Sequence, residues 1–470
     1  MATKKDLVEA YSFSRRRLVT AFVSGAPGGR EVEPARPGRM IVGGVALAIL
    51  LVAGAAIAGA LSDRAEVDWK KSGLVADDRG ALYVILDEDA VPGQPRVRPV
   101  INVTSAQLIL GATVEARKVP DDELAGVRKG PTIGILDAPA TVPTVKSLDQ
   151  SGWTSCTGTG HGMKTAVSRT PGVTAVPDDA FVVRSDEDDK VYLVAEADTP
   201  GLPRRAYRYE LPADNPGLYI ELGISPNDEI TVPGAWLELF PPGDPLDADG
   251  LGLDGAGKPA GLPGYDGARV GDVVVENDKT YALTRDGLLE LSPFAAAVLR
   301  NTAFGKSARK PAELDYVPSA QVDIVAPAAD AREFWPEQVF GRSLPSTEQA
   351  CVQLVTAKGQ PAAARLATSP QGDASAEDVE PGDREVTVAS GQGAVVRSAD
   401  WISSDDGTIH LVDDRGYSYP VASTYDLEQL GYAKVPVVVV PDVWNKLFEA
   451  GPELSQDAAL CPPSKDQSCG

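Results

Sequence analysis

One stretch of the sequence, residues 40–61, contains no charged side chain at all. It reads MIVGGVALAILLVAGAAIAGAL, and as an α-helix it would rise about 33 Å, enough to cross the hydrocarbon core of a bilayer. Helices in the core of a water-soluble protein seldom run this far without a polar residue. The stretch therefore predicts a single transmembrane helix at residues 40–61.

The charges on either side of this stretch predict its orientation. Residues 1–39 hold eight basic and four acidic side chains, whereas Asp63, Glu66 and Asp68 follow the stretch. Basic flanks stay on the cytoplasmic side of a membrane. We therefore expect a single-pass protein of the cell membrane, with residues 1–39 in the cytoplasm and residues 62–470 outside.

Two other interpretations of the apolar stretch are weaker. Ala58, Gly59 and Ala60 resemble a signal-peptidase site, but the apolar region of a signal peptide is shorter and lies nearer the terminus. A buried core helix would be shorter as well.

The net charge of the chain is -23, and residues 62–470 carry -27 because residues 1–39 carry +4. So acidic a body repels nucleic-acid backbones, which argues against nucleic acid as a partner. The 46 glycines and 38 prolines favour many turns and short strands over long helices.

All four cysteines, Cys156, Cys351, Cys461 and Cys469, follow the predicted span. An even number outside the membrane suggests two disulfides, for which three connectivities exist. The short polar loop between Cys461 and Cys469 favours a local pair, which leaves Cys156 and Cys351. Free thiols or a metal site are the alternatives, although the chain has no C-x-x-C and only two histidines.

A fifteen-residue phrase occurs twice, at residues 232–246 and 440–454. Both copies fit V-P-x-x-W-x-x-L-F-x-x-G-x-x-L. In each copy a strand is expected to end at Val-Pro and a short helix to follow. The aromatic residues would then share one helix face and serve packing between repeats; they are Trp236, Phe240, Trp444 and Phe448.

Four units of strand, turn, strand and helix are expected outside the membrane, beginning near residues 76, 186, 274 and 403. They include RGALYVIL, DDKVYLVA, NDKTYALT and DGTIHLVD as first strands. Their irregular spacing argues against a solenoid. The fold class expected is α+β, a single transmembrane helix plus an elongated external region of four small strand–strand–helix repeats around a central mixed domain.

These units give a set of expected domains. They are a cytoplasmic helix and linker at 1–39, the span at 40–61, repeat 1 at 62–125, the first part of the central domain at 126–180, repeat 2 at 181–250, a loop and repeat 3 at 251–325, the second part of the central domain at 326–400, and repeat 4 with a disulfide-closed tail at 401–470.

No catalytic constellation, cofactor site or metal site is evident. Residues 305–307 read GKS, but a phosphate loop needs glycine where Arg300 stands. His161 lies in a loop of small residues, where a Ser–His–Asp triad has nothing else to support it. His410 occupies the position of a tyrosine in its repeat, which favours a structural role.

The loop at 241–267 contains three aspartates, Asp247, Asp249 and Asp254, among glycines. The calcium-binding EF-hand pattern fails here, because Pro245 and Ala256 occupy its first and twelfth positions. Composition alone predicts a flexible loop, so these aspartates are only weak candidates for metal ligands.

The N-terminal segment KKDLVEAYSFSRRRLVTAFVSG predicts an amphipathic helix. Residues expected to make cytoplasmic contacts are Tyr11, Phe13, Arg16 and Arg17. The arginines would reach anionic headgroups or an acidic partner; an ordinary solvated basic flank is the alternative.

Taken in order along the chain, these motifs resemble the EccB family, the single-pass membrane component of the type VII (ESX) secretion apparatus of actinobacteria. The Y-x-F-x-x-R-R-x-x-x-A-x-V motif from Tyr11, the span, SAQLIL, GPTIGILDAPATVP, Trp153 with Cys156, LFPPGDPL and YALTRDGLLELSPFAAAVL carry the resemblance. Each is weak alone, and their order makes the match specific.

The resemblance implies four external repeats around a central domain stapled by a Cys156–Cys351 disulfide. It implies assembly with EccC-like, EccD-like and EccE-like proteins into a large complex, expected to be hexameric, in which the EccC-like protein is the ATPase. The function expected is that of a structural subunit and not an enzyme. A membrane-anchored peptidoglycan-binding protein is the alternative, and an ATPase, as some family members are labelled, is weaker because no Walker A motif occurs here.

Overall fold

The computed structural model describes residues 10, 11, 14, 69–87, 93–212, 215–304, 309–318, 321–326 and 334–464. The chain divides into two units, Met1–Ala65 and Glu66–Gly470. The stretch predicted to span the membrane lies outside the described residues. Within the described ranges, no helix combines the length and apolar character needed to cross a bilayer.

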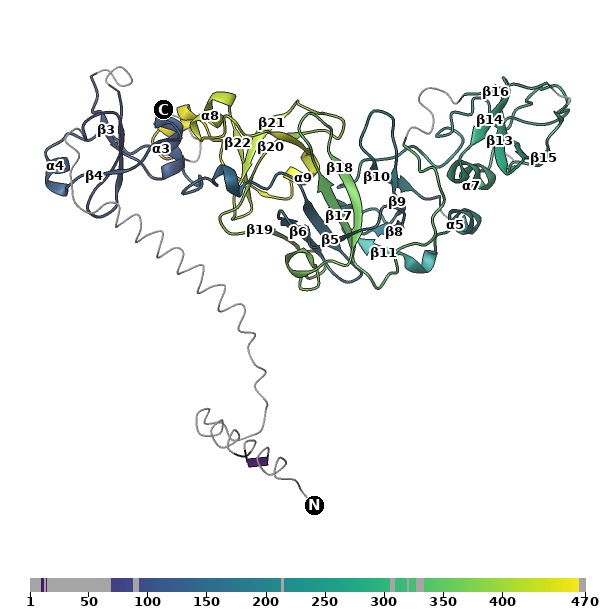
Figure 1. The fold of residues 1–470 in the computed structure, drawn as a ribbon, viewed down its shortest axis with the longest axis horizontal. Helices are drawn as coiled ribbons and strands as arrows, with labels where there is room; N and C mark the ends of the chain where they lie inside the picture. The colour runs from purple at the N-terminus through teal and green to yellow at the C-terminus, as the bar shows by residue number, and fades with distance from the viewer. Residues whose placement is uncertain are drawn as a thin grey trace. The chain divides into compact units, whose positions relative to one another are not determined.

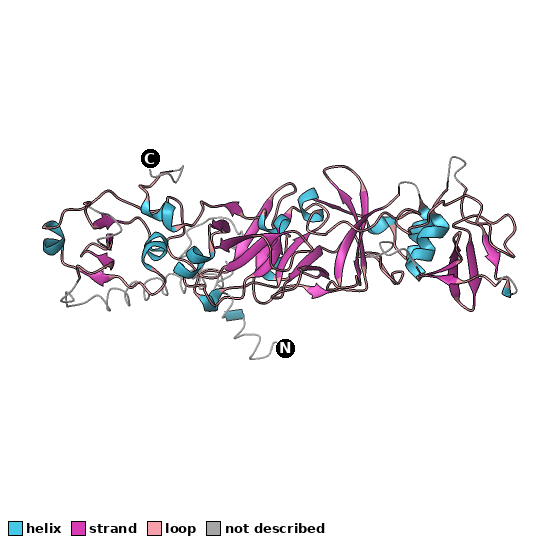
Figure 2. Ribbon diagram, turned by 90° about the horizontal axis from the view of Figure 1, so that it is seen from above, coloured by secondary structure: helices cyan, strands magenta, loops and turns pink. Residues whose placement is uncertain are grey.

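The second unit is a mixed α and β structure in which strands predominate and the helices are short (Figure 2). Its described strands form five sheets. This agrees with the abundance of glycine and proline, which shortens every element.

Four of these sheets share one connectivity. Three antiparallel strands are followed by a helix and then by a strand that runs parallel to the first. The first sheet consists of β1 Gly73–Ala76, β2 Leu82–Ile85, β3 Val97–Pro99, α3 Val103–Leu110 and β4 Arg117–Lys118. The second consists of β8 Ala180–Ser185, β9 Val191–Ala197, β10 Arg205–Glu210, α5 Pro216–Leu222 and β11 Ile230–Val232.

The other two sheets add a fifth strand parallel to the third. One consists of β12 Val273–Glu276, β13 Lys279–Leu283, β14 Leu288–Leu291, α7 Pro293–Asn301, β15 Glu313–Asp315 and β16 Ile324–Val325. The other consists of β20 Ala394–Ala399, β21 Thr408–Val412, β22 Tyr417–Val421, α8 Thr424–Gln429, β23 Val438–Pro441 and β24 Glu449–Ala450. We call these four the first, second, third and fourth sheets.

The sequence-based units correspond to the middle of each sheet. The expected strand pairs and helices are the second strand, the third strand and the helix that follows. Each sheet also has a strand before these elements and one after them. The fourth sheet therefore begins at Ala394, inside the range 326–400 that the sequence predicted for the central domain.

The fifth sheet is assembled from two distant segments. Its order is β19-β6-β5-β17-β18-β7, with β5 Trp153–Thr157, β6 Met163–Val167, β7 Thr174–Ala175, β17 Ala350–Val355, β18 Ala363–Thr368 and β19 Arg384–Val388. Figure 1 shows blue β5 and β6 beside green β17 and β18. We call it the central sheet.

The remaining described elements are short. They are the helices α4 Asp121–Ala125, α6 Gly234–Leu237, α9 Asp442–Asn445 and α10 Gln456–Leu460, and the 3-10 turns η2 Val145–Ser147, η3 Pro226–Asp228 and η5 Gly372–Ala374.

The helices begin and end where the local chemistry predicts. Ser292 caps α7 by accepting a hydrogen bond from the Ala295 N–H, and Pro293 occupies the first turn, where no N–H is needed. Gly223 ends α5 with φ of 74°, the left-handed conformation expected for the glycine of its Leu-Gly pair.

Alternation along the strands divides the interior into cores. In the second sheet, Phe181 and Val183 face one core, and Ala180 and Val182 face another. The core that Phe181 and Val183 face also contains side chains from the central sheet and from one side of the fourth sheet. The other contains α5, α7 and the third sheet. A further core joins α3 to α8 and α10 on the far side of the fourth sheet.

Candidate functional site

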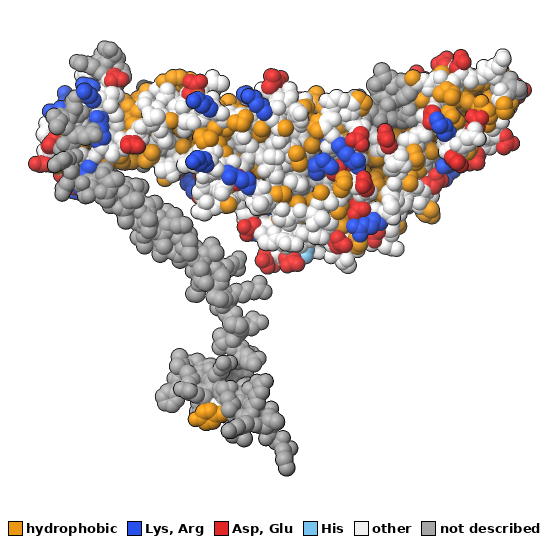
Figure 3. Space-filling model, in the orientation of Figure 1, with side chains coloured by type: hydrophobic (Ala, Val, Ile, Leu, Met, Phe, Trp, Pro, Cys, Tyr) orange, Lys and Arg blue, Asp and Glu red, His pale blue; other side chains and the backbone are white. Residues whose placement is uncertain are grey.

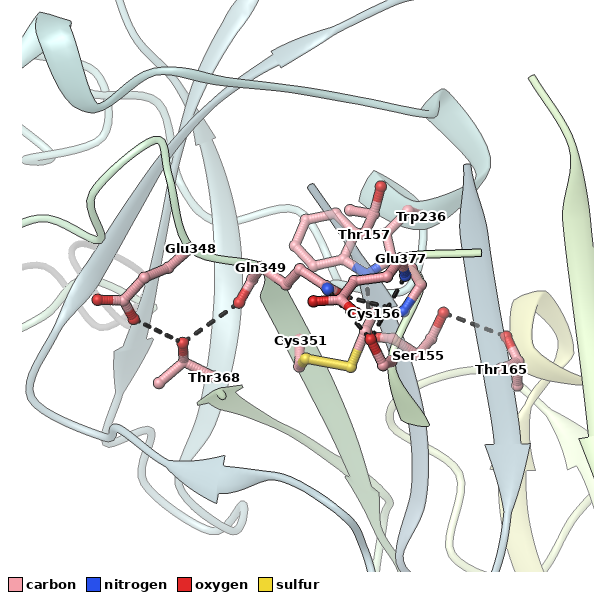
Figure 4. The surroundings of a disulfide bond; sticks show 12 residues. Ser155, Cys156, Thr157, Thr165, Trp236, Glu348, Gln349, Cys351, Thr368 and Glu377 are labelled. Atoms are coloured by element: carbon pink, nitrogen blue, oxygen red, sulfur yellow. Dashed lines mark hydrogen bonds between the residues drawn. A yellow bond between two sulfur atoms is a disulfide. The ribbon is translucent and has the colours of Figure 1, made fainter. Parts of the chain in front are cut away.

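The central sheet is held by a disulfide between its two segments. Cys156 on β5 and Cys351 on β17 lie directly opposite each other in antiparallel register, with their Cα atoms 4.1 Å apart. Both cysteines are fully buried. Figure 4 shows the bond between the two strands. The pairing is the one that the family resemblance implied, and it closes a loop of 195 residues in sequence separation.

Of the other two cysteines, only Cys461 lies among the described residues. Cys461 is disulfide-bonded, and its sulfur also lies 3.1 Å from the Asp457 carbonyl oxygen. Cys469, its predicted partner, lies outside the described residues. The described part of the chain contains no free cysteine.

The repeated phrase packs both of its copies into the core on one face of the central sheet. Trp236 and Trp444 are completely buried, and Leu239, Phe240, Leu447 and Phe448 are buried with them. The indole N–H of Trp236 donates to the Ser155 carbonyl on β5 at 3.0 Å. Phe448 meets Trp153 of β5 edge to face, with ring centroids 5.4 Å apart. The phrase thus joins the second and fourth sheets to the central sheet.

One detail of the phrase differs from expectation. The helices α6 and α9 end at Leu237 and Asn445, so the Leu-Phe pair of each copy lies just beyond its helix. The side chains still reach the same core, because the chain continues in turns closed by backbone bonds such as Leu239 N–H to the Trp236 carbonyl.

The glycine of the phrase has a partner that the sequence did not reveal. A Cβ on Gly243 would lie 2.1 Å from the ring of Tyr209, and one on Gly451 would lie 2.2 Å from the ring of Tyr419. Both tyrosines are buried on the third strand of their sheets. Each glycine is therefore required by an aromatic ring that lies against the backbone.

Replacing Gly451 with alanine is expected to destabilise the protein by about 1–3 kcal/mol, because the added methyl group overpacks a ring that cannot move freely. The Tyr419 hydroxyl is fixed at 3.0 Å from an Asp413 carboxylate oxygen. Urea unfolding of the full-length protein measures the change. Gly341→Ala is the control, since a Cβ there meets nothing within 4 Å. An equal effect of the two substitutions would contradict this account.

A buried carboxylate also ties the second sheet to the central sheet. Glu196 on β9 has a fully buried side chain and accepts from Arg365 Nε at 2.9 Å, from the Leu366 N–H at 3.0 Å and from Arg204 Nε at 3.1 Å. Charge-assisted bonds of this kind compensate for burying the charge. No sequence motif marked these residues, because Arg365 and Leu366 are 169 and 170 positions away from Glu196 and Arg204 is 8 positions away.

Neither histidine forms a catalytic arrangement with its described neighbours. No hydrogen bond among the described residues links the His161 ring to a serine or a carboxylate. His410 Nδ1 lies 3.0 Å from Ser418 Oγ, which in turn donates to Asn445 Oδ1. Burial lowers the pKa of His410, against a smaller opposing effect of Asp442. His410 lies on β21, as Tyr83, Tyr192 and Tyr281 lie on the matching strands.

The Gly-rich loop at 241–267 is an integral part of a core and not the flexible loop that its composition predicted. Its apolar side chains are buried with the third sheet; they are Leu246, Leu251, Leu253, Ala260, Leu262 and Tyr265. Asp247 accepts from the N–H groups of Asp249 and Gly250, which closes a local turn. Among the described residues, no cluster of three or more His, Cys, Asp or Glu side chains could hold a metal ion, and Asp254 is not part of one.

In the third sheet a buried carboxylate anchors the start of β12. Asp272 accepts from the N–H groups of Arg269 and Ala312, each at 2.9 Å, and from Arg309 Nη2 at 3.0 Å. Burial alone would raise the pKa of Asp272, but these hydrogen bonds together outweigh burial and lower it.

Asp272 is expected to make the third sheet sensitive to acid. Because its folded-state pKa lies below the ordinary value of 3.8, its contribution is fully present above that value and is lost as the pH falls through the lower folded value. Asp272→Asn should therefore lower the urea midpoint at neutral pH, and the difference from wild type should shrink in acid. Urea unfolding near neutrality and near pH 3 tests this. A difference that stays constant with pH would contradict it.

Most of the residues predicted to make cytoplasmic contacts lie outside the described part of the chain. Ala10, Tyr11 and Ser14 are helical, and Tyr11 is 74% exposed. Phe13, Arg16, Arg17 and the GKS sequence at 305–307 lie outside. On the face drawn in Figure 3, basic side chains occur in small groups among acidic and apolar ones.

A family model described as "Type VII secretion system ESX-1, transport TM domain B" matches residues 1–464. The ESX-5 secretion system ATPase EccB5 of Mycobacterium tuberculosis is 26% identical over 504 residues, covering 96% of this chain and 92% of that protein. The ESX-2 secretion system ATPase EccB2 of the same organism is 26% identical over 437 residues, covering 83% of each.

Two solved structures share the fold. A chain of an intact ESX-5 inner membrane complex matches with a TM-score of 0.60 and 23% identity, covering 99% of this chain and 96% of its own length. The EccB3 dimer from the ESX-3 core complex matches with a TM-score of 0.61 and 21% identity, covering 83% of this chain and 99% of its own. Since the family model spans nearly the whole sequence, the chain belongs to the EccB family of the type VII secretion system.

Proposed function

We propose that this protein is a structural subunit of a type VII secretion complex in the inner membrane. The observation that carries the proposal is the match of the EccB family model to residues 1–464. The construction of the described body supports it. The tryptophans of the repeated phrase are built into the core that joins three sheets, and the Cys156–Cys351 disulfide cross-links the central sheet on its other face, which is how a scaffold uses such residues.

The four sheets of common connectivity are, in this proposal, copies that arose by duplication around the central sheet. The second and fourth sheets support this best. Their phrases are 208 residues apart, and so are the strand and helix starts Ile230 and Val438, and Gly234 and Asp442. The domain assignment is retained with one adjustment, that the fourth repeat begins with β20.

Anchoring is proposed through one helix at residues 40–61, with residues 1–39 in the cytoplasm and the bulk of the chain outside. The charge asymmetry around the stretch supports this orientation. A disulfide-bonded body also fits an oxidising compartment outside the cytoplasm.

The partners proposed are further copies of this chain and EccC-like, EccD-like and EccE-like proteins in a hexameric assembly. One solved relative is described as a dimer and another as part of an inner membrane complex, which supports self-association and membrane partners. The role is proposed to be non-enzymatic, although relatives are named ATPases.

Purification of the full-length protein from its own membranes in mild detergent tests the proposal. We expect it to migrate as a large complex on native gels and to co-purify with an FtsK/SpoIIIE-like ATPase and with a polytopic membrane protein, identified by mass spectrometry. A free monomer without a membrane ATPase would overturn the proposal. Sedimentation of that free monomer with purified cell wall would instead favour the peptidoglycan-binding alternative.

A further inference from the structure

The buried disulfide of the central sheet lies beneath a segment that follows Cys351 in the chain. Residues 371–383, which we call the strap, bury Ala374, Ala376 and Val379. Ala374 packs in one cluster with Cys156, Cys351 and Ala367. This cluster lies on the face of the central sheet opposite the tryptophan core, since Val352 and Leu354 alternate with Cys351 along β17 and point into that core.

The strap is attached to the β5–β6 hairpin and its flank by backbone hydrogen bonds. Gln371 N–H donates to the Gly172 carbonyl at 2.7 Å, Gly162 N–H donates to the Val379 carbonyl at 2.9 Å, and Met163 N–H donates to the Asp383 carbonyl at 3.0 Å. Between these ends, Gln349 holds the middle of the strap. Its Oε1 accepts from the Ala376 N–H at 2.9 Å, and its Nε2 donates to Ser375 Oγ at 3.2 Å. Figure 4 shows Gln349 beside the disulfide.

Two glycines leave room for the strap to cross. A Cβ on Gly162 would lie 2.3 Å from the Asp383 carbonyl oxygen and 2.4 Å from that of Glu380. A Cβ on Gly172 would lie 2.6 Å from the Gln371 carbonyl oxygen. In both cases the obstacle is backbone, so a side chain at either position would have to displace the strap.

A closed strap is incompatible with thiol–disulfide exchange at this bond. Exchange requires a thiolate to approach one sulfur from outside, through a mixed disulfide, and both cysteines are completely buried. The exposed residues of the strap add negative charge, which repels an incoming thiolate; they are Asp373, Glu377, Asp378, Glu380 and Asp383.

We infer that the strap is a conformational lock: the bond between Cys156 and Cys351 has to form before the strap docks over the two sulfurs, and from then on the opening of the strap limits exchange at that bond. Formation transfers two electrons and two protons from the two thiols to an oxidant that is itself a disulfide, which becomes two thiols. Once the strap has docked, neither an oxidant nor a reductant reaches the sulfurs.

Reduction of the native full-length protein by dithiothreitol tests the lock. The reagent attacks one sulfur, its second thiol then releases the mixed disulfide, and it leaves as a cyclic disulfide while two cysteine thiols form. Free thiols at Cys156 and Cys351 are followed with time by alkylation and peptide mapping, which separates them from the thiol that reduction releases at Cys461. We expect Gly162→Ala to accelerate reduction at least about 10-fold, because the added methyl group displaces the strap. The matched control is Gly160→Ala in the same hairpin, where a Cβ meets nothing within 4 Å although φ is +79°; its rate should stay within about 3-fold of wild type.

A second variant and a second measurement keep the test decisive if Gly162→Ala does not fold. Gln349→Ala removes the clamp on the middle of the strap and should also accelerate reduction. In the reverse direction, reduced and unfolded protein is returned to native buffer, and oxidised glutathione is added after increasing delays. We expect the yield of the Cys156–Cys351 bond to fall as the delay grows. Equal reduction rates in strap variants and control, or a yield independent of the delay, would overturn the inference.

Discussion

Replacing both Cys156 and Cys351 with alanine is expected to lower the free energy of unfolding by about 3–5 kcal/mol. The bond joins strands that are 195 residues apart in sequence, so its loss restores a large amount of conformational freedom to the unfolded chain. The effect should fall on the whole of the central sheet, since β5 and β17 are its two middle strands. Urea unfolding of the full-length protein, followed by tryptophan fluorescence, measures the loss as a lower midpoint.

The matched control is the wild-type protein unfolded in strong reductant. Once its disulfides are broken, its midpoint should approach that of the double variant in the same reductant, which separates the loss of the cross-link from the loss of two buried sulfur atoms. A double variant with the midpoint of oxidised wild type would contradict the prediction. It would mean that the antiparallel register of β5 and β17 alone holds the two segments together.

Local signals in the sequence were sufficient to predict the second strand, the third strand and the following helix in each of the four sheets of common connectivity. The strand pairs and their helices carry alternating apolar residues, turn residues and caps such as Ser292 and Gly223, all of which act within a few positions. Helical spacing also predicted a packing role for Trp236 and Trp444, although their helices end before the Leu-Phe pair of each copy.

The remaining strands could not be recognised in the same way. β8 reads AFVVRS and β20 reads AVVRSA, and both face a core on each side, so they lack the alternation that marks a half-buried strand. Their partners include β11 and β23, which follow only after a helix. Such pairing depends on contacts across the sheet, and no local pattern encodes it.

The glycine–tyrosine contacts and the strap also depend on contacts between distant segments, which no local sequence pattern encodes. The glycine of the phrase was visible, but Tyr209 and Tyr419, which require it, lie more than 30 residues earlier on another strand. No feature of the sequence marked the strap over the disulfide within the expected central domain, because only the tertiary fold shows that Ala374, Ala376 and Val379 are buried. Composition likewise misjudged the loop at 241–267, whose alternating small and apolar residues cover the third sheet.

Truncating Trp236 to alanine is expected to cost about 3–5 kcal/mol, since it empties the space of a fully buried indole at the junction of α6 and the central sheet. The duplicated phrase supplies a sharper comparison. Trp236 donates its N–H to the Ser155 carbonyl, whereas the equally buried Nε1 of Trp444 has no hydrogen-bond partner among the described residues. Trp236→Phe removes a hydrogen bond, but Trp444→Phe removes a donor that was already costly to bury.

We therefore expect Trp236→Phe to be more destabilising than Trp444→Phe by about 1–2 kcal/mol, although the two changes are chemically identical and occur in equivalent positions. Urea midpoints of the two variants, each compared with wild type, give the difference directly. Equal losses would show that volume alone governs both sites and that the Ser155 hydrogen bond contributes nothing measurable. A larger loss at Trp444 would show that this indole is satisfied in solution. The expected order would instead mean that the two copies contribute different stability, although both bury the same residue types. The copy that follows the second sheet is hydrogen-bonded to β5 through Trp236, and the copy that follows the fourth sheet lacks this bond.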